Sequence, residues 1–201
     1  MHDLPDLVQK LLHSLQQVPY LASKNLYKVT SHFMEQDSAK IAQFCKILLD
    51  VNQQIARCKR CFTWQQVDAS CTFCDNLKRN PEIVCVVEAW QDVLVIERTS
   101  NFTGQYHVLC GVISPLNGVG PANLTIDYLV KRVKEQGIQE VILALSQTPE
   151  SEATVAYIMD RLQGFNLKIS VLAQGMPVGS SLEYMDRVTL MKAIVNRKQL
   201  L

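Results

Sequence analysis

Several features that would place this chain in a common class are missing from its sequence. No run of about 18 apolar residues is present, which argues against a membrane-spanning helix. The N-terminus lacks a basic segment followed by an apolar core and a cleavage site, so nothing in it indicates export. We therefore expect a cytoplasmic protein whose seven cysteines are reduced.

Signatures of nucleotide binding are also missing. The chain has no Gly-x-x-x-x-Gly-Lys-Ser/Thr phosphate loop, and Gly118-Val119-Gly120 does not open a full dinucleotide-binding motif. The net charge is only +1, which neither requires nor excludes a nucleic-acid partner. Residues 1–80 hold 10 Lys and Arg against 7 acidic residues, and residues 81–201 hold 10 against 12. This mild asymmetry would place phosphate contacts near the front, and ordinary solvated charge explains it equally well.

Cysteine, by contrast, occurs in a regular pattern. Cys58-x-x-Cys61 and Cys71-x-x-Cys74 are separated by nine residues, and each two-residue gap lets a tight turn aim two sulfurs at one ion. Four thiolates fill a tetrahedral coordination sphere, which predicts one structural, non-catalytic Zn²⁺ per chain. Two disulfides or unrelated buried thiols are the alternatives, but neither explains the repeated spacing.

Isolated cysteines and a histidine are expected in the core. Cys45, Cys85 and Cys110 lie in apolar neighbourhoods, which favours buried and inert thiols over nucleophiles. His107 lies in an apolar strand pattern, so a core histidine is a better interpretation than a catalytic base.

The first part of the chain predicts three helices. Apolar residues at three- and four-residue steps predict the first helix, with Asp3 as its cap and Pro5 in its first turn. The second helix is expected over residues 22–34, with Lys24 and Lys28 away from its apolar face. The third is expected from 37 or 38 to about 55, burying Ile41, Phe44, Cys45, Leu48 and Ile55.

The rest of the chain alternates between strand and helix patterns. The continuous apolar run 83–87 suits a strand covered on both faces of a parallel sheet. The other expected elements are strands at 106–109, 141–145 and 167–172, and helices at 92–98, 123–136, 151–162 and 185–197. This order implies βαβ crossovers and a layered α/β fold with a mostly parallel sheet and a C-terminal helix.

Acidic residues gather where such a sheet would carry its function, at the carboxyl ends of its strands. Glu88, Asp92, Glu150 and Glu152 would form a cluster able to hold Mg²⁺ through oxygen ligands. The interpretation we favour is that they are solvated or stabilise helix N-termini. No Asp-x-Asp follows the strand at 141–145, which weakens the case for two-metal chemistry on nucleic acid.

Taken in this order, a helical hairpin, a four-cysteine site and an α/β domain resemble the RecR family of bacterial recombination mediators, over nearly the whole chain. The distinctive stretches are Cys58-x-x-Cys61 with Cys71-x-x-Cys74, Val84-Cys85-Val86-Val87-Glu88, Tyr106-His107-Val108-Leu109, Ile113-Ser114-Pro115-Leu116, Gly118-Val119-Gly120-Pro121 and Gly175-Met176-Pro177-Val178-Gly179. The resemblance implies a helix-hairpin-helix over 1–56, a four-cysteine zinc finger over 57–80, a Toprim domain over 81–175 and an assembly segment over 176–201.

The resemblance also implies a function. RecR proteins are not known as enzymes; they form rings of dimers or tetramers that act with RecO and RecF to load RecA at single-stranded gaps. On that analogy Glu88, Glu150 and Glu152 would contact partner proteins. A Mg²⁺-dependent Toprim nuclease or topoisomerase-like enzyme using Glu88 is the alternative, and a scaffold that has lost DNA binding is a third.

The hairpin departs from the family pattern. Leu15 to Ser23 occupies the place of the family's Leu-Pro-Gly-(Ile/Val)-Gly-Pro-Lys-Ser-Ala, so that Gln17 and Pro19 replace both glycines and Leu21 replaces the lysine. The glycine turn is what lets backbone N–H groups reach phosphate without steric hindrance. The candidate phosphate contacts are instead the cations Lys24, Lys28, Lys59 and Arg60, with Lys78 and Arg79 in addition.

Overall fold

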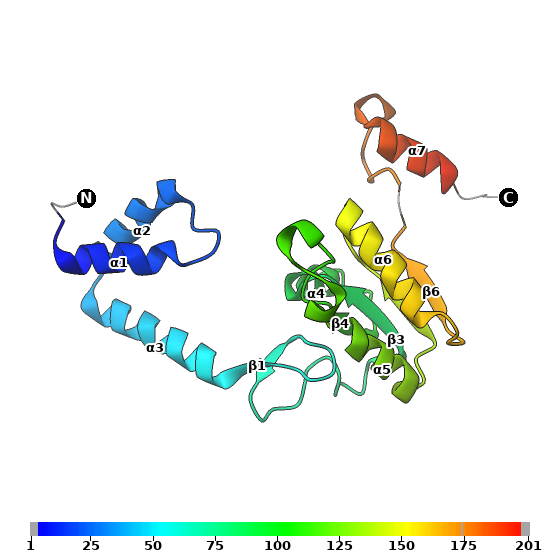
Figure 1. Ribbon diagram of the computed structural model, residues 1–201, viewed down its shortest axis with the longest axis horizontal. Coiled ribbons are helices and arrows are strands. Elements are labelled where there is room, and N and C mark those ends of the chain that lie inside the picture. Colours follow the sequence, from blue (N-terminus) through cyan, green and yellow to red (C-terminus); the bar gives the residue numbers. More distant parts are fainter. Residues whose placement is uncertain (1–3, 174, 198–201) are drawn as a thin grey trace. The chain divides into compact units, whose positions relative to one another are not determined.

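The computed structural model describes residues 4–173 and 175–197 of the chain (Figure 1). The chain divides into two compact units, with the boundary between Ile55 and Ala56. Among the described helices, none combines the length and the apolar character needed to cross a membrane.

The first unit consists of three helices, α1 (Asp6–Gln16), α2 (Ser23–Glu35) and α3 (Ser38–Gln54). Helices α1 and α2 pack against each other, and Leu12 and Leu26 are buried. Pro5 precedes the first turn of α1, while the expected cap Asp3 lies outside the described residues. Helix α3 begins as expected after Asp37, whose carboxylate accepts the Ala39 N–H at 2.7 Å.

The expected burial of α3 is wrong for the single chain. None of its residues is buried; Phe44 and Leu48 are 45% and 53% exposed, and Cys45 is also exposed. Ile41 and Ile55 are half-buried. The stripes of α1 and α2 cover each other, and a unit of about 55 residues has too little apolar material to cover a third helix on its own.

The second unit contains a four-stranded, all-parallel sheet with the order β4-β3-β5-β6. Its strands are β3 (Asn80–Val87), β4 (Gly104–Val108), β5 (Glu140–Leu143) and β6 (Lys168–Val171). A separate pair, β1 (Ile55–Arg57) and β2 (Trp64–Gln66), precedes the sheet. The expected α/β fold with a parallel sheet is therefore confirmed.

The second unit's helices are α4 (Trp90–Glu97), α5 (Ile126–Gln136), α6 (Pro149–Leu162) and α7 (Arg187–Val195). Helix α5 begins later than expected because Pro121–Asn123 form a separate 3₁₀ turn, and Gly137 ends it in the left-handed conformation with φ 63°. Helix α7 also begins later, at the residue after Asp186, whose carboxylate accepts the N–H groups of Val188 and Thr189.

The apolar run of β3 is buried on both faces, as expected. Val84 and Val86 belong to the core shared with α5 and α6, whereas Cys85 and Val87 pack with Val93 of α4. Strand β4 lies at the edge of the sheet, and there the Val108 N–H donates to the carbonyl of Cys61 at 2.8 Å. The cysteine segment thus covers part of an edge that would otherwise carry unpaired backbone groups.

Candidate metal centre

The four cysteine sulfurs predicted to bind metal lie together. The Sγ atoms of Cys58, Cys61, Cys71 and Cys74 are all within 4.8 Å of one another, and all four residues are buried. A tetrahedral zinc site with Zn–S bonds of about 2.3 Å separates its sulfurs by roughly 3.8 Å. The cluster could therefore hold one metal ion, and four thiolates are a donor set that suits Zn²⁺.

Local hydrogen bonds shape both cysteine turns in the same way. The N–H of Phe62 donates to the carbonyl of Cys58 at 3.0 Å, and the N–H of Asp75 donates to that of Cys71 at 2.9 Å. Phe62 lies in the left-handed region, with φ 61°, which turns the chain sharply after Cys61. Each Cys-x-x-Cys pair is thus a closed turn that points its two sulfurs inward.

The close approach of the thiols moves their pKa values apart. The hydrogen bond with Cys61 lowers the pKa of Cys58 to about 6. Hydrogen bonds with Cys58 lower the pKa of Cys71 and raise the pKa of Cys61 and Cys74. Four thiolates this close repel one another, so full ionisation requires a cation among them. The chemistry of the donor set therefore fits a divalent metal.

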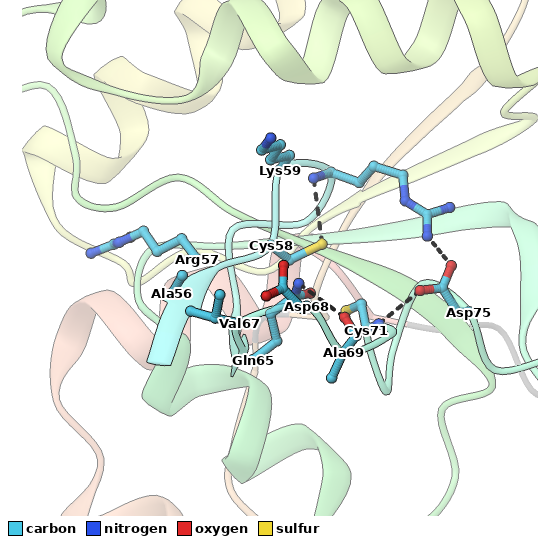
Figure 2. A pocket seen from close by; sticks show the side chains of 11 residues that line it. Ala56, Arg57, Cys58, Lys59, Gln65, Val67, Asp68, Ala69, Cys71 and Asp75 are labelled. Atoms are coloured by element: carbon cyan, nitrogen blue, oxygen red, sulfur yellow. Dashed lines mark hydrogen bonds and ion pairs between the residues drawn. The ribbon is translucent and has the colours of Figure 1, made fainter. Parts of the chain in front are cut away.

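The predicted DNA-contacting cations lie in both units. Lys24 and Lys28 are exposed on α2, and Lys59 and Arg60 are exposed in the first cysteine turn. Arg60 forms an ion pair with Asp75, whose other carboxylate oxygen accepts the Cys71 N–H at 2.7 Å (Figure 2). Arg60 therefore braces the second cysteine turn. Lys59, beside a cavity of about 420 Å³, points away from the sulfurs.

The four acidic residues do not assemble into a metal site. Within residues 4–173 and 175–197, the four cysteines are the one group whose ligand atoms lie close enough to share an ion. One carboxylate oxygen of Glu88 accepts the Ser146 N–H at 2.6 Å and the Ser151 hydroxyl at 2.7 Å. Asp92 accepts the Ala89 N–H at the start of α4. These two carboxylates tie a loop and a helix start in place.

The other two acidic residues belong to the N-terminal turn of α6. Glu150 is half-buried, and Glu152 is exposed and forms an ion pair with Lys192 of α7 at 3.5 Å. Negative charge in this turn also interacts favourably with the helix dipole, which is the role that the sequence favours over Mg²⁺ binding.

The isolated cysteines divide into two kinds. Cys85 is buried, and burial raises its pKa to about 12, so the expected inert thiol is confirmed. The expectation is wrong for Cys45 and Cys110, which are exposed. Cys45 lies on the uncovered α3, and Cys110 leaves the core because the chain turns there with φ 68° shortly after β4. The Arg57 guanidinium donates to the Cys110 sulfur.

His107 is a core histidine, as expected. It is fully buried, and its Nε2 lies 2.9 Å from the Thr125 hydroxyl and 3.1 Å from the Thr125 carbonyl. Burial lowers the pKa of His107 to about 3, and the nearby Arg132 charge acts in the same direction. The imidazole is therefore neutral at physiological pH.

Sequence reasoning missed Arg132, a buried charged residue near the cysteine centre. It is 4% exposed on α5, among the buried positions Ile126, Leu129 and Val133. The signal that could have identified it is an arginine on the apolar face of an otherwise amphipathic helix.

Comparisons with known proteins agree with this architecture. Residues 82–173 match the Toprim domain family, and residues 175–198 match the family described as RecR, C-terminal. The Recombination protein RecR of Bacteroides thetaiotaomicron is 41% identical over 95% of this chain and 93% of its own length. Those of Synechococcus elongatus and Myxococcus xanthus are 39% and 35% identical, over 95% and 98% of this chain and 95% and 99% of their own lengths. The chain therefore belongs to the RecR family of recombination proteins.

Proposed function

We propose that the protein is a non-catalytic mediator of recombinational DNA repair, which acts with RecO and RecF to load RecA at single-stranded gaps. Relatives named as recombination proteins align with nearly its full length, which supports the repair role. The observation that carries the non-catalytic part is the engagement of Glu88. Its carboxylate receives two hydrogen bonds from the segment joining β5 to α6, so it acts as a structural acceptor.

The cysteine cluster would hold one structural Zn²⁺ through Cys58, Cys61, Cys71 and Cys74. When bound, the ion supplies a cross-link between the two turns and leaves no coordination position for substrate. Those turns dock on β4, through Cys61 to Val108 and through Cys74 to Gln105. The centre would thus fix the segment that precedes the Toprim sheet.

Exposed lysines would bind DNA by contacting its phosphates. Lys24 and Lys28 lie four residues apart on α2, so they share one face of the helix. Lys59 would add a contact from the cysteine turn. Arg60 is the fourth candidate, and its ion pair with Asp75 makes it the weakest of the four.

Partner proteins would be recognised at the carboxyl edge of the sheet, near Glu88, Glu150 and Glu152. A ring of homodimers or tetramers would present several such edges to gapped or junction DNA.

Substituting Glu150 with lysine should weaken RecO binding, and Glu135→Lys on α5 is the matched control.

Salt dependence tests DNA binding. Replacing both Lys24 and Lys28 by alanine removes two phosphate contacts, so the slope of log affinity against log salt on gapped duplex should fall by about 1.8. The matched control is Lys40→Ala with Lys46→Ala, two exposed lysines on α3. A wild-type slope near zero would instead support a scaffold without DNA contacts.

Labelled single- and double-stranded DNA incubated with Mg²⁺ tests the enzymatic alternative. The non-catalytic proposal expects intact DNA. Cleavage by the wild type that Glu88→Gln abolishes would overturn it.

A further inference from the structure

A buried cation lies behind the cysteine centre without a carboxylate to balance it. Arg132 donates Nη1–H to the carbonyl of Tyr106 at 2.6 Å, Nε–H to Gln136 Oε1 at 3.0 Å, and Nη2–H to Gln105 Oε1. All three acceptors are neutral. Within the part of the chain that the structure describes, no acidic side chain forms an ion pair with it. A buried charge is retained only when something compensates its lost hydration.

The cysteine cluster supplies negative charge on the required side. Burial and the nearby Arg60 charge lower the pKa of the Arg132 guanidinium, whereas Coulombic attraction to the cysteines of the cluster acts in the opposite direction. Four thiolates around a divalent ion leave a complex with a net negative charge, itself buried and in need of a counter-charge. The positive charge of Arg132 would therefore balance the negative charge of the metal-loaded cluster, and the cluster would in turn compensate the buried guanidinium.

A hydrogen-bond chain also connects the two. Gln105 of β4 is 7% exposed; its Oε1 accepts from Arg132, and its Nε2 donates to the carbonyl of Cys74 at 3.1 Å. Moving the guanidinium would release the Gln105 amide and, with it, the carbonyl that ends the second cysteine turn. Outer contacts of this kind orient the ligands of a metal and tune its affinity.

A cavity of about 230 Å³ beside Arg132 offers a competing interpretation as a phosphate site, because Lys59, Arg60 and Lys131 also line it. Most of that positive charge is already engaged. Arg60 pairs with Asp75, and Lys131 lies 3.9 Å from Glu135. Arg132 uses its two terminal nitrogens to donate to Tyr106 and Gln105, both buried. Arg132 is linked through Gln105 to the Cys74 carbonyl, which favours a role toward the cysteine centre over binding of an external anion.

We propose that Arg132 is the counter-ion of the loaded cysteine centre and a positioning residue for its second turn, and so sets how tightly the chain retains its metal. The proposal rests on the structural zinc centre and goes beyond it. Wild-type protein without bound zinc would refute the centre itself. If the wild type holds zinc but an Arg132 variant releases it no faster, only this inference is refuted and the zinc centre stands.

The test compares zinc release from full-length Arg132→Met, Arg132→Lys and Lys131→Met proteins, loaded with zinc and challenged with a chromogenic chelator. Because outer-contact substitutions cost roughly 10- to 100-fold in metal affinity, Arg132→Met should release zinc at least about 10-fold faster. Arg132→Lys, which keeps the charge, should recover part of the loss. Lys131→Met is the control, an exposed neighbour on the same helix, and should match the wild type.

A spectroscopic readout separates charge compensation from general loosening. In Co²⁺-loaded protein, removing the cation in Arg132→Met should shift the sulfur-to-metal charge-transfer band, whereas Lys131→Met should leave it in place. If Arg132→Met does not fold, Gln105→Glu provides the second test. It replaces the amide donor to Cys74 with a carboxylate that competes for Arg132, so it should also speed release.

Two results would overturn the proposal. One is zinc release and a cobalt spectrum unchanged in Arg132→Met, or, where that variant does not fold, unchanged in Gln105→Glu. The other is weakened DNA binding in Arg132→Met with normal zinc release, which would assign the cavity to phosphate instead.

Discussion

At the scale of single residues, burial decides the charge of His107. The ring is fully buried and its folded pKa lies near 3, below the unfolded value of about 6.5. The unfolded chain therefore binds a proton that the folded chain rejects between these two values. Stability contributed by this residue is present above the unfolded pKa and is lost as pH falls toward the folded one.

A pH series should detect this effect. Between pH 7 and pH 5.5 the wild type should lose about 1.3 kcal/mol of unfolding free energy through His107, a loss that His107→Gln avoids. Denaturant titrations at the two pH values measure the difference between wild type and variant. Equal pH dependence in the wild type and His107→Gln would contradict the assignment.

At the scale of elements, Asp75 holds the second cysteine turn from two sides. One carboxylate oxygen accepts the Cys71 N–H, and the other pairs with Arg60 of the first turn. We expect Asp75→Ala to lower the unfolding free energy by about 1–2 kcal/mol, the usual cost of a charge-assisted hydrogen bond that is partly open to water. Chemical denaturation of zinc-loaded protein measures it. Thr72→Ala, an exposed change in the same turn, should cost far less.

The elements themselves were largely predictable from local pattern. The apolar run 83–87 and the glycine after residue 136 placed β3 and the end of α5, because each depends on neighbours in sequence. The four-cysteine site was equally predictable from its spacing. The start of α5 was not, because Pro121–Asn123 form their own turn.

Long-range contacts account for what the pattern left out. A local pattern predicts an apolar stripe on a helix but does not show whether another element buries it. The exposure of α3 is therefore not predictable from its sequence alone. The donors to Glu88 lie 58 and 63 residues away along the chain, and Arg132 reaches 27 residues back to Gln105. Such partners become visible only once the sheet brings them together.

At the scale of the whole molecule, the metal should stabilise one unit and not the other. All four cysteines and their contacts on β4 lie within residues 56–201. Stripping zinc with a chelator should therefore lower the melting temperature of that unit by about 10 °C.

Hydrogen exchange locates the effect within the chain. After zinc removal the Val108 amide should exchange faster, because its hydrogen-bond acceptor is the Cys61 carbonyl. Amides of α1 and α2 should exchange as slowly as before. Loss of protection spread evenly over residues 4–54 would show that the metal stabilises the chain in another way. Cys74→Ser should reproduce the chelated state, with zinc content falling in parallel.

The cysteine segment that covers the outer edge of β4 also bears on how readily the protein aggregates. A bare sheet margin is a template on which another chain can add its own strand, the first step of amyloid-like growth. Loss of zinc would then expose this margin to other chains, and we expect turbidity in chelator-treated samples as the first sign of aggregation.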